Sequence, residues 1–112
     1  MILLQLSDPV NYPHCYGTLP EMQANTIEDR VYSTTAICTY PQGVNVAGLW
    51  DMAGNVWEWT SSKHEDGEGL RVLRGGSWYN DQDYAQCAYR LGSGVGYSNH
   101  NIGFRLVSPS VF

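Results

Sequence analysis

The chain has 112 residues, a formal net charge of −5, 12 glycines and 15% charged residues. This length suits one domain with a modest core, and the glycine and aromatic content favours a loop-rich, β-leaning fold. The negative charge argues against nucleic acid, which needs a basic face. No apolar run approaches the roughly 18 residues of a membrane span, so we expect neither a nucleic-acid partner nor a membrane span.

Residues 1–6 are apolar but short, and they lack a basic start and a small-residue cleavage site. They predict a first strand rather than a signal peptide. The compartment stays open, and display on a cell surface or virion is compatible with the sequence. Cys15, Cys38 and Cys87 form an odd set without a CxxC pair. Buried free thiols are the default, and one disulfide is the alternative for an exported protein.

Residues 31–40 alternate in places and are rich in Thr, Tyr and Ile, which predicts a strand. Residues 41–43, Pro-Gln-Gly, then predict a turn. Farther along, residues 61–69 are polar and glycine-rich, which is typical of an exposed loop. Residues 71–78 predict a returning strand that ends on a packed tryptophan.

Residues 48–60 read GLWDMAGNVWEWT and combine three tryptophans with two acidic groups. Gly54-Asn55 predicts a tight turn, because both residues tolerate positive φ. Trp57 and Trp59 are two apart, so in a strand they face one side and Glu58 faces the other. The motif therefore predicts a turn followed by a strand with buried rings. The gathered carboxylates need a cation or hydrogen-bond donors.

Residues 79–100 differ in character, because about half of them are Tyr, Ser, Gly and Asn. This composition is typical of antibody contact loops, where tyrosine gives rigid contact area and the small polar residues adapt. Helical and strand periodicity are weak across the segment. The composition predicts a binding surface, and the alternative is an ordinary polar loop.

Three motifs together resemble the formylglycine-generating-enzyme (sulfatase-modifying factor) family: GLWDMAGNVWEW, RVLRGGSW at 71–78 and NIGFR at 101–105. The resemblance implies a loop-rich α+β, C-type-lectin-like fold with a small twisted antiparallel sheet. It implies one domain over 1–112, divided into a shortened N-terminal segment (1–24), a scaffold (25–78), a variable binding region (79–101) and a terminal strand (102–112). The shortened N-terminal segment would be compensated by a homo-oligomer.

The resemblance also implies two structural calcium sites. Their ligands would be Asn25, Thr26, Asp29 and Val31 in the first, and Asp51, Gly54, Val56 and Glu58 in the second, with carbonyl oxygens from Thr26, Val31, Gly54 and Val56. Such mixed oxygen ligands suit calcium. For the first site, the alternative is a capping turn at Asn25 beside a solvated Asp29. For the second site, the alternative is that Asp51 and Glu58 accept hydrogen bonds from Arg74 or from turn amides.

Residues 79–100 further resemble the variable region of diversity-generating-retroelement proteins, many of which use this domain. In those proteins asparagine codons of the AAY type are changed at their adenines, which yields Tyr, Asp, His, Ser, Gly, Leu and Asn. Those residue types occupy Tyr79, Asn80, Asp81, Asp83, Tyr84, Tyr89, Leu91, Gly92, Ser93, Gly94, Gly96, Tyr97, Ser98 and His100. Gln82 and Gln86 are not such products.

The sequence predicts a display protein that binds an unknown target, either a protein or another cell-surface ligand, and not an enzyme. Formylglycine-generating enzymes use paired cysteines with copper, whereas the matching region here offers Asn80 and Tyr84, so no copper is expected. The alternatives are a catalytically inactive structural module of the family or an active oxidase. Tyrosines buried away from water would contradict the display hypothesis.

Overall fold

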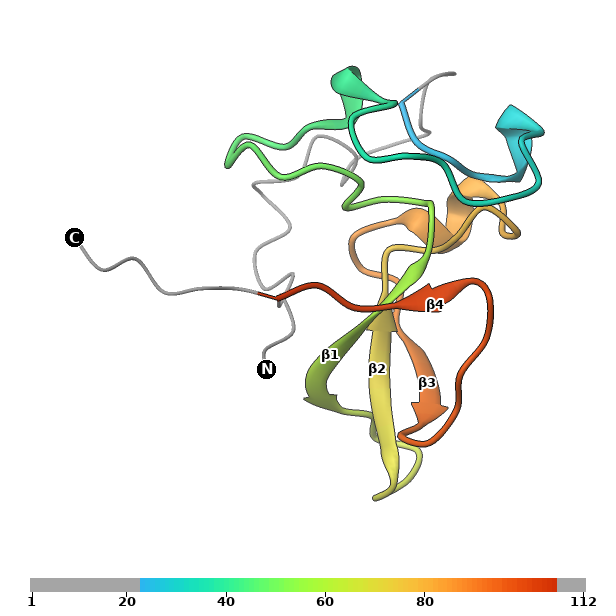
Figure 1. Ribbon diagram of the computed structural model, residues 1–112. Coiled ribbons are helices and arrows are strands. Elements are labelled where there is room, and N and C mark those ends of the chain that lie inside the picture. The colour runs from blue at the N-terminus through green and yellow to red at the C-terminus, as the bar shows by residue number, and fades with distance from the viewer. Residues whose placement is uncertain (1–22, 107–112) are drawn as a thin grey trace.

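The computed structural model describes residues 23–106, which are built on one four-stranded sheet in the order β3-β2-β1-β4 (Figure 1). The strands are β1 (Trp57–Lys63), β2 (Leu70–Arg74), β3 (Leu91–Gly94) and β4 (Ile102–Gly103). β2 pairs antiparallel with both β1 and β3, whereas β4 joins β1 in parallel. The sheet is therefore small and mixed rather than wholly antiparallel.

The turn and strand predicted around the tryptophan motif are confirmed. Gly54 and Asn55 adopt φ values of 75° and 67°, and β1 begins two residues later. Trp57 is buried at 2% exposure, while Trp59 is only partly covered. The buried residues of β2 that complete this core, Val72 and Leu73, are fully inaccessible to solvent.

The strand predicted over residues 31–40 is wrong, because the chain forms bends and turns there and most of its side chains are exposed. Amide side chains hold this segment instead of a strand ladder. Asn25 Nδ2 donates to the Ser33 carbonyl at 2.8 Å, and the Thr35 N–H donates to Asn55 Oδ1 at 3.0 Å. Residues rich in Thr and Tyr favour strands only where a partner edge is available, and these residues pair with none.

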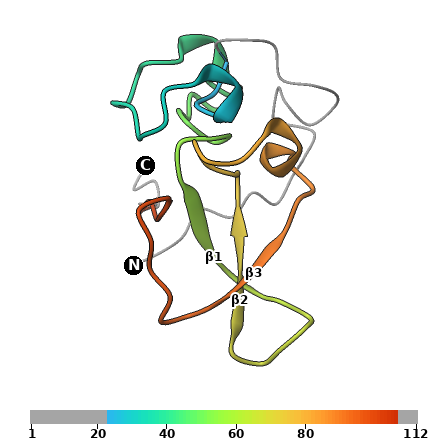
Figure 2. The same cartoon turned by 90° about the vertical axis from the view of Figure 1, so that its right-hand side faces the viewer.

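The three single-turn 3-10 helices of residues 23–106 are η2 (Ile27–Asp29), η3 (Pro41–Gly43) and η4 (Gln82–Ala85). η3 lies at the turn predicted for residues 41–43. The loops of residues 23–50 and η4 lie at one end of the sheet, and the β1–β2 hairpin tip lies at the other (Figures 1 and 2). Across the described residues, no helix is long and apolar enough to cross a membrane.

The strand predicted for residues 1–6, and the ends of the predicted segments 1–24 and 102–112, lie outside the described residues. Cys87 is disulfide-bonded, which corresponds to the disulfide alternative of the sequence, whereas Cys38 is free and exposed.

Candidate ligand-binding surface

The fourteen candidate variable positions divide into exposed and partly covered residues. The exposed set comprises Tyr79, Asp81, Asp83, Tyr84, Gly96, Tyr97, Ser98 and His100. The partly covered set comprises Asn80, Tyr89, Leu91, Gly92, Ser93 and Gly94. The exposed set falls in two stretches, one around η4 and one in the connection from β3 to β4, which runs along the edge of the sheet (Figure 1).

The first aromatic cluster of this surface rests on Trp57. Tyr84 meets the Trp57 ring edge-on at a centroid distance of 6.3 Å, and Tyr89 lies 5.9 Å from the same ring. The two tyrosines also contact each other at 4.9 Å in a T-shaped arrangement. Tyr84 remains 36% exposed, so the buried tryptophan supports a ring that solvent can reach.

The second aromatic cluster rests on Trp78. Tyr79 packs edge-on against it at 5.7 Å, and His100 lies tilted over it at 5.4 Å. Tyr79 is 63% exposed and His100 is also exposed. Residues from opposite ends of the variable segment are therefore brought together on one tryptophan, a juxtaposition that the sequence spacing did not reveal.

Asn80 points inward, unlike its neighbours. Its Oδ1 accepts hydrogen bonds from Trp57 Nε1 at 2.8 Å and from Ser77 Oγ at 2.6 Å. Asn101 Nδ2 in turn donates to Ser77 Oγ at 3.2 Å. This network links β1, the RVLRGGSW segment and the terminal motif, so the Asn80 side chain serves the scaffold.

The turn η2 lies beside η4 and adds residues that the sequence did not associate with the surface. The Gln82 N–H donates to Glu28 Oε1 at 2.9 Å, and the Ile27 N–H donates to the Asn80 carbonyl at 3.0 Å. Burial acts to raise the pKa of Glu28, but hydrogen bonds from Thr26 and the Gln82 N–H outweigh it and lower that pKa. Glu28 is consequently ionised beside the variable residues at neutral pH.

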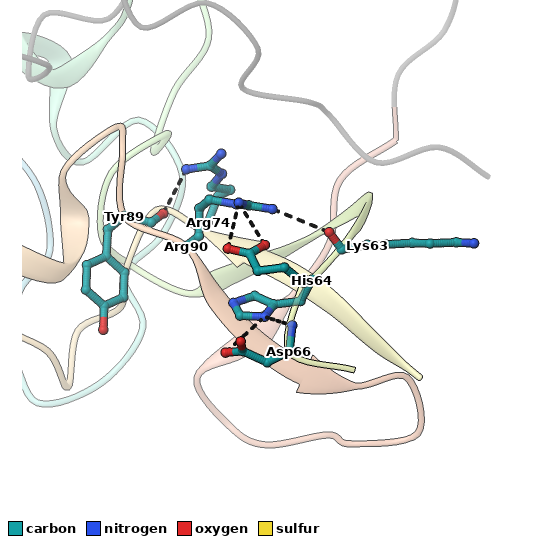
Figure 3. Close-up of polar contacts among 7 residues, drawn as sticks. Lys63, His64, Asp66, Arg74, Tyr89 and Arg90 are labelled. Atoms are coloured by element: carbon teal, nitrogen blue, oxygen red, sulfur yellow. Dashed lines mark hydrogen bonds and ion pairs between the residues drawn. The ribbon is translucent and has the colours of Figure 1, made fainter. Parts of the chain in front are cut away.

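Framework arginines hold the backbone beneath the surface (Figure 3). Arg74 Nη1 donates to the Tyr89 carbonyl at 3.0 Å. It also donates to the Cys87 carbonyl at the same distance. Arg90 pairs with the Glu65 carboxylate at 2.9 Å and also donates to a carbonyl of the β1–β2 hairpin. These arginines therefore anchor the variable segment through its Cys87 and Tyr89 carbonyls and through the flanking Arg90–Glu65 ion pair.

Residues 91–94 form the edge strand β3, although the sequence showed no strand periodicity there. Ser93 pairs with Arg71, and Gly92 pairs with Val72. A Cβ at Gly92 would lie 2.9 Å from the His64 ring. Substitution at Gly92 would therefore move His64, whereas Gly94 faces open space.

The first predicted calcium set retains free oxygen donors. Asn25 Oδ1 and Asp29 Oδ2 are buried without a hydrogen-bond partner. The Thr26 carbonyl accepts from the Asp29 N–H at 3.1 Å, which leaves it a second lone pair. Val31 is 41% exposed at the end of this loop. Unsatisfied buried oxygens fit a hard cation, so the donor chemistry of this set suits calcium.

The second predicted calcium set is arranged differently. Both carboxylate oxygens of Glu58 accept from Arg105, with Arg105 Nε at 2.7 Å from Oε2 and Nη2 on Oε1. The Asp51 carboxylate is buried and its two oxygens lack partners. Burial raises the pKa values of Asp51 and Glu58 against the opposing effect of Arg105. Arg74, the arginine that the sequence suggested as a donor, instead donates to the carbonyls of Cys87 and Tyr89.

A groove of about 400 Å³ opens beside this second set, and it is lined by residues that include Ile37, Cys38, Trp50 and Phe104. None of the candidate variable positions is among the lining residues. The groove and the aromatic surface are therefore separate features of the domain.

The small curled sheet, the scarcity of helix and the loop-dominated surface define a C-type-lectin-like scaffold of the formylglycine-generating-enzyme type. The sulfatase-modifying factor enzyme 1-like domain model matches residues 9–109, and the chain belongs to this family. It is 37% identical over 89 residues to mouse (Mus musculus) inactive C-alpha-formylglycine-generating enzyme 2, covering 74% of this chain and 29% of that protein. It is 38% identical over 113 residues to Streptomyces coelicolor formylglycine-generating enzyme, covering 84% and 34%.

Solved structures give the same fold. Treponema denticola variable protein 1 matches with a TM-score of 0.67 and 26% identity, over 75% of this chain and 35% of that one. Pseudomonas aeruginosa PvdO matches with a TM-score of 0.74 and 20% identity, over 93% and 50%. The chain spans about three tenths of the length of the mouse and bovine (Bos taurus) inactive C-alpha-formylglycine-generating enzyme 2.

Proposed function

We propose that this chain is a ligand-binding display module of the diversity-generating-retroelement type, in which exposed side chains vary on a fixed scaffold. The observation that carries the proposal is the packing of exposed rings, edge-on or tilted, against tryptophans that belong to the scaffold. Tyr79, Tyr84 and His100 offer ring surface to solvent, while Trp57 and Trp78 support them from below. The similarity to Treponema denticola variable protein 1 supports the same function.

The target is a protein or another cell-surface ligand. Exposed tyrosines provide rigid, amphipathic contact area at low entropic cost, which suits the anchor positions of a protein interface. The exposed carboxylates of Asp81 and Asp83 and the neighbouring Glu28 add polar groups that discriminate between partners.

Two libraries of equal size test whether the exposed residues can vary while the fold is kept. One randomises the exposed Tyr79, Asp81, Tyr97 and Ser98, and the other randomises the inward Asn80, Ser77, Thr60 and Val72. Members of the first library should fold and yield binders on selection against protein targets, whereas most members of the second should not fold. Equal folding losses in the two libraries would contradict the display function.

The coding DNA offers a second, independent test. A nearby near-repeat of the last hundred or so bases that differs only at adenines, beside a reverse-transcriptase gene, is the expected arrangement. A locus with neither feature would refute diversification of this chain, even if its surface binds a ligand.

A catalytically inactive structural module is the second candidate, and the similarity to an inactive relative favours it. Both candidates imply that the chain is not an oxidase. By the resemblance to formylglycine-generating enzymes, the paired catalytic thiols would fall at Asn80 and Tyr84. Cys87 is disulfide-bonded, and Cys38 lines the separate groove. Copper-loaded protein incubated with a sulfatase-motif peptide should leave the peptide cysteine unchanged. Conversion of that cysteine would refute both candidates.

We also propose a structural calcium ion in the first loop, held by Asn25 and Asp29 with carbonyls of Thr26 and Val31. Its support is the pair of buried, unpartnered oxygens on Asn25 and Asp29. A bound ion would hold the loop before η3 against the tight turn at Gly54, with which Asn25 forms an isolated bridge. Calcium should raise the melting temperature of the wild type and leave that of Asp29→Ala unchanged. An equal response in both proteins would contradict this site.

A further inference from the structure

The guanidinium of Arg105 is surrounded by four oxygens. Nε and Nη2 donate to the two carboxylate oxygens of Glu58. Nη1 donates to the Trp50 carbonyl at 2.9 Å, and Nη2 donates to the Asp51 carbonyl at 3.1 Å. The pair is largely buried, because the side chains of Arg105 and Glu58 are 25% and 12% exposed. One cation therefore joins the segment after β4, strand β1 and the loop before the tight turn.

This arrangement uses the oxygens that a calcium ion in the second predicted set would need. Calcium prefers carboxylate and carbonyl oxygens, and a bidentate glutamate is a common ligand. Both oxygens of Glu58 already accept charge-assisted hydrogen bonds, and a divalent cation beside the guanidinium would be repelled. The second set therefore does not fit calcium as this chain is folded.

We propose that Arg105 is the resident cation of this loop and takes the place of calcium there, independently of the ligand-binding function proposed above. Its guanidinium fixes residues 50–51 against Glu58, residues that lie 47 to 55 positions away from it in sequence. The loop is consequently braced without an exogenous ion. Asp51 is the one carboxylate of the set that retains free oxygens. The Arg105 guanidinium also donates to the Asp51 carbonyl, so its positive charge opposes a calcium ion at the Asp51 carboxylate unless Arg105 is removed.

The test is calcium titration by calorimetry together with thermal unfolding, with and without chelator. Glu58→Gln should give the same calcium isotherm as the wild type, because Glu58 does not bind the ion. Its melting temperature should fall by more than about 10 °C in calcium and in chelator alike, because a largely buried charge loses its partner. Arg105→Met frees Glu58 beside Asp51 and should therefore bind one additional calcium equivalent.

Arg74→Met is the matched control, since Arg74 is also partly buried and donates to two carbonyls. It should lower the melting temperature without adding a calcium equivalent. A wild-type protein that loses one calcium equivalent on Glu58→Gln substitution would overturn the proposal. So would a Glu58→Gln protein destabilised only in calcium. If Arg105→Met does not fold, the comparison of wild type with Glu58→Gln decides alone.

Discussion

Trp57 Nε1 donates a 2.8 Å hydrogen bond to Oδ1 of Asn80, which joins the most buried tryptophan to the first turn of the variable segment. Ser77 Oγ donates to the same oxygen at 2.6 Å. The hydrogen bond from Trp57 holds the start of the variable segment against β1. Tyr79 and Asp81, on either side of Asn80, consequently point outward.

Asn80→Leu should destabilise the domain by about 2–3 kcal/mol, because it leaves the buried donors of Trp57 and Ser77 without an acceptor. For a domain of this size the melting temperature should fall by roughly 10 °C or more. Thermal unfolding followed by circular dichroism measures the change. Asn99→Leu is the control, because Asn99 is exposed, and its effect should stay within about 1 kcal/mol. Equal losses at the two positions would show that Asn80 is an ordinary surface residue.

Exposed tyrosines should be exchangeable without loss of the fold. Tyr97→Ser should change the free energy of unfolding by less than about 1 kcal/mol, because Tyr97 is 53% exposed. Tyr89→Ser should cost about 2–4 kcal/mol, because Tyr89 packs on Trp57 and Tyr84. Denaturant unfolding of both variants checks the contrast. A Tyr97 variant as unstable as the Tyr89 variant would argue against a freely variable surface.

Gly54 should not tolerate a side chain. It adopts a φ of +75°, and a Cβ there would lie 2.6 Å from the Asn25 carbonyl oxygen. Gly54→Ala combines backbone strain with a steric clash, so it should cost about 2–5 kcal/mol. Gly96→Ala meets nothing within 4 Å and should be neutral or stabilising by up to about 1 kcal/mol. Chemical denaturation of the two alanine variants side by side provides the measurement.

Tyr40 should ionise at a higher pH than an ordinary tyrosine. Burial, together with the nearby Asp29, raises its pKa to about 12 from an ordinary value of 10. Because the folded pKa is the higher one, this contribution to stability is complete below pH 10 and is lost between pH 10 and about 12. Absorbance titration near 295 nm in chelator should show a late step for Tyr40, and that step should disappear in Tyr40→Phe. An unchanged titration curve in Tyr40→Phe above pH 11 would refute the shift.

The tryptophan motif illustrates what local sequence can specify. Gly54 and Asn55 allow positive φ whatever surrounds them, and the alternation that follows predicts β1. The local sequence could not show in this way that Tyr79 faces solvent while Asn80 faces inward. Both residue types occur at candidate variable positions, and only the distant Trp57 shows that Asn80 faces inward.

Local sequence also did not decide whether a segment forms a strand, as residues 31–40 and β3 (Leu91–Gly94) show. The first has strand-forming residues but no partner edge, and the second has weak periodicity but lies beside β2. The sequence predicted Glu58 as a calcium ligand, with hydrogen bonds from Arg74 or turn amides as the alternative. Arg105 donates to it instead, because the parallel pairing of β4 with β1 brings the C-terminal motif beside Glu58.

By itself, the sequence determined the family, the tight turn, the presence of the two hairpin strands but not their ends, and a segment rich in exposed aromatic residues. Turn preference, strand alternation and residue composition depend only on residues that are close together in the sequence. Tertiary structure decided which of those residues face solvent, which tryptophan supports each ring and which cation neutralises Glu58. Those outcomes depend on contacts between residues tens of positions apart, and such contacts form only when the sheet closes.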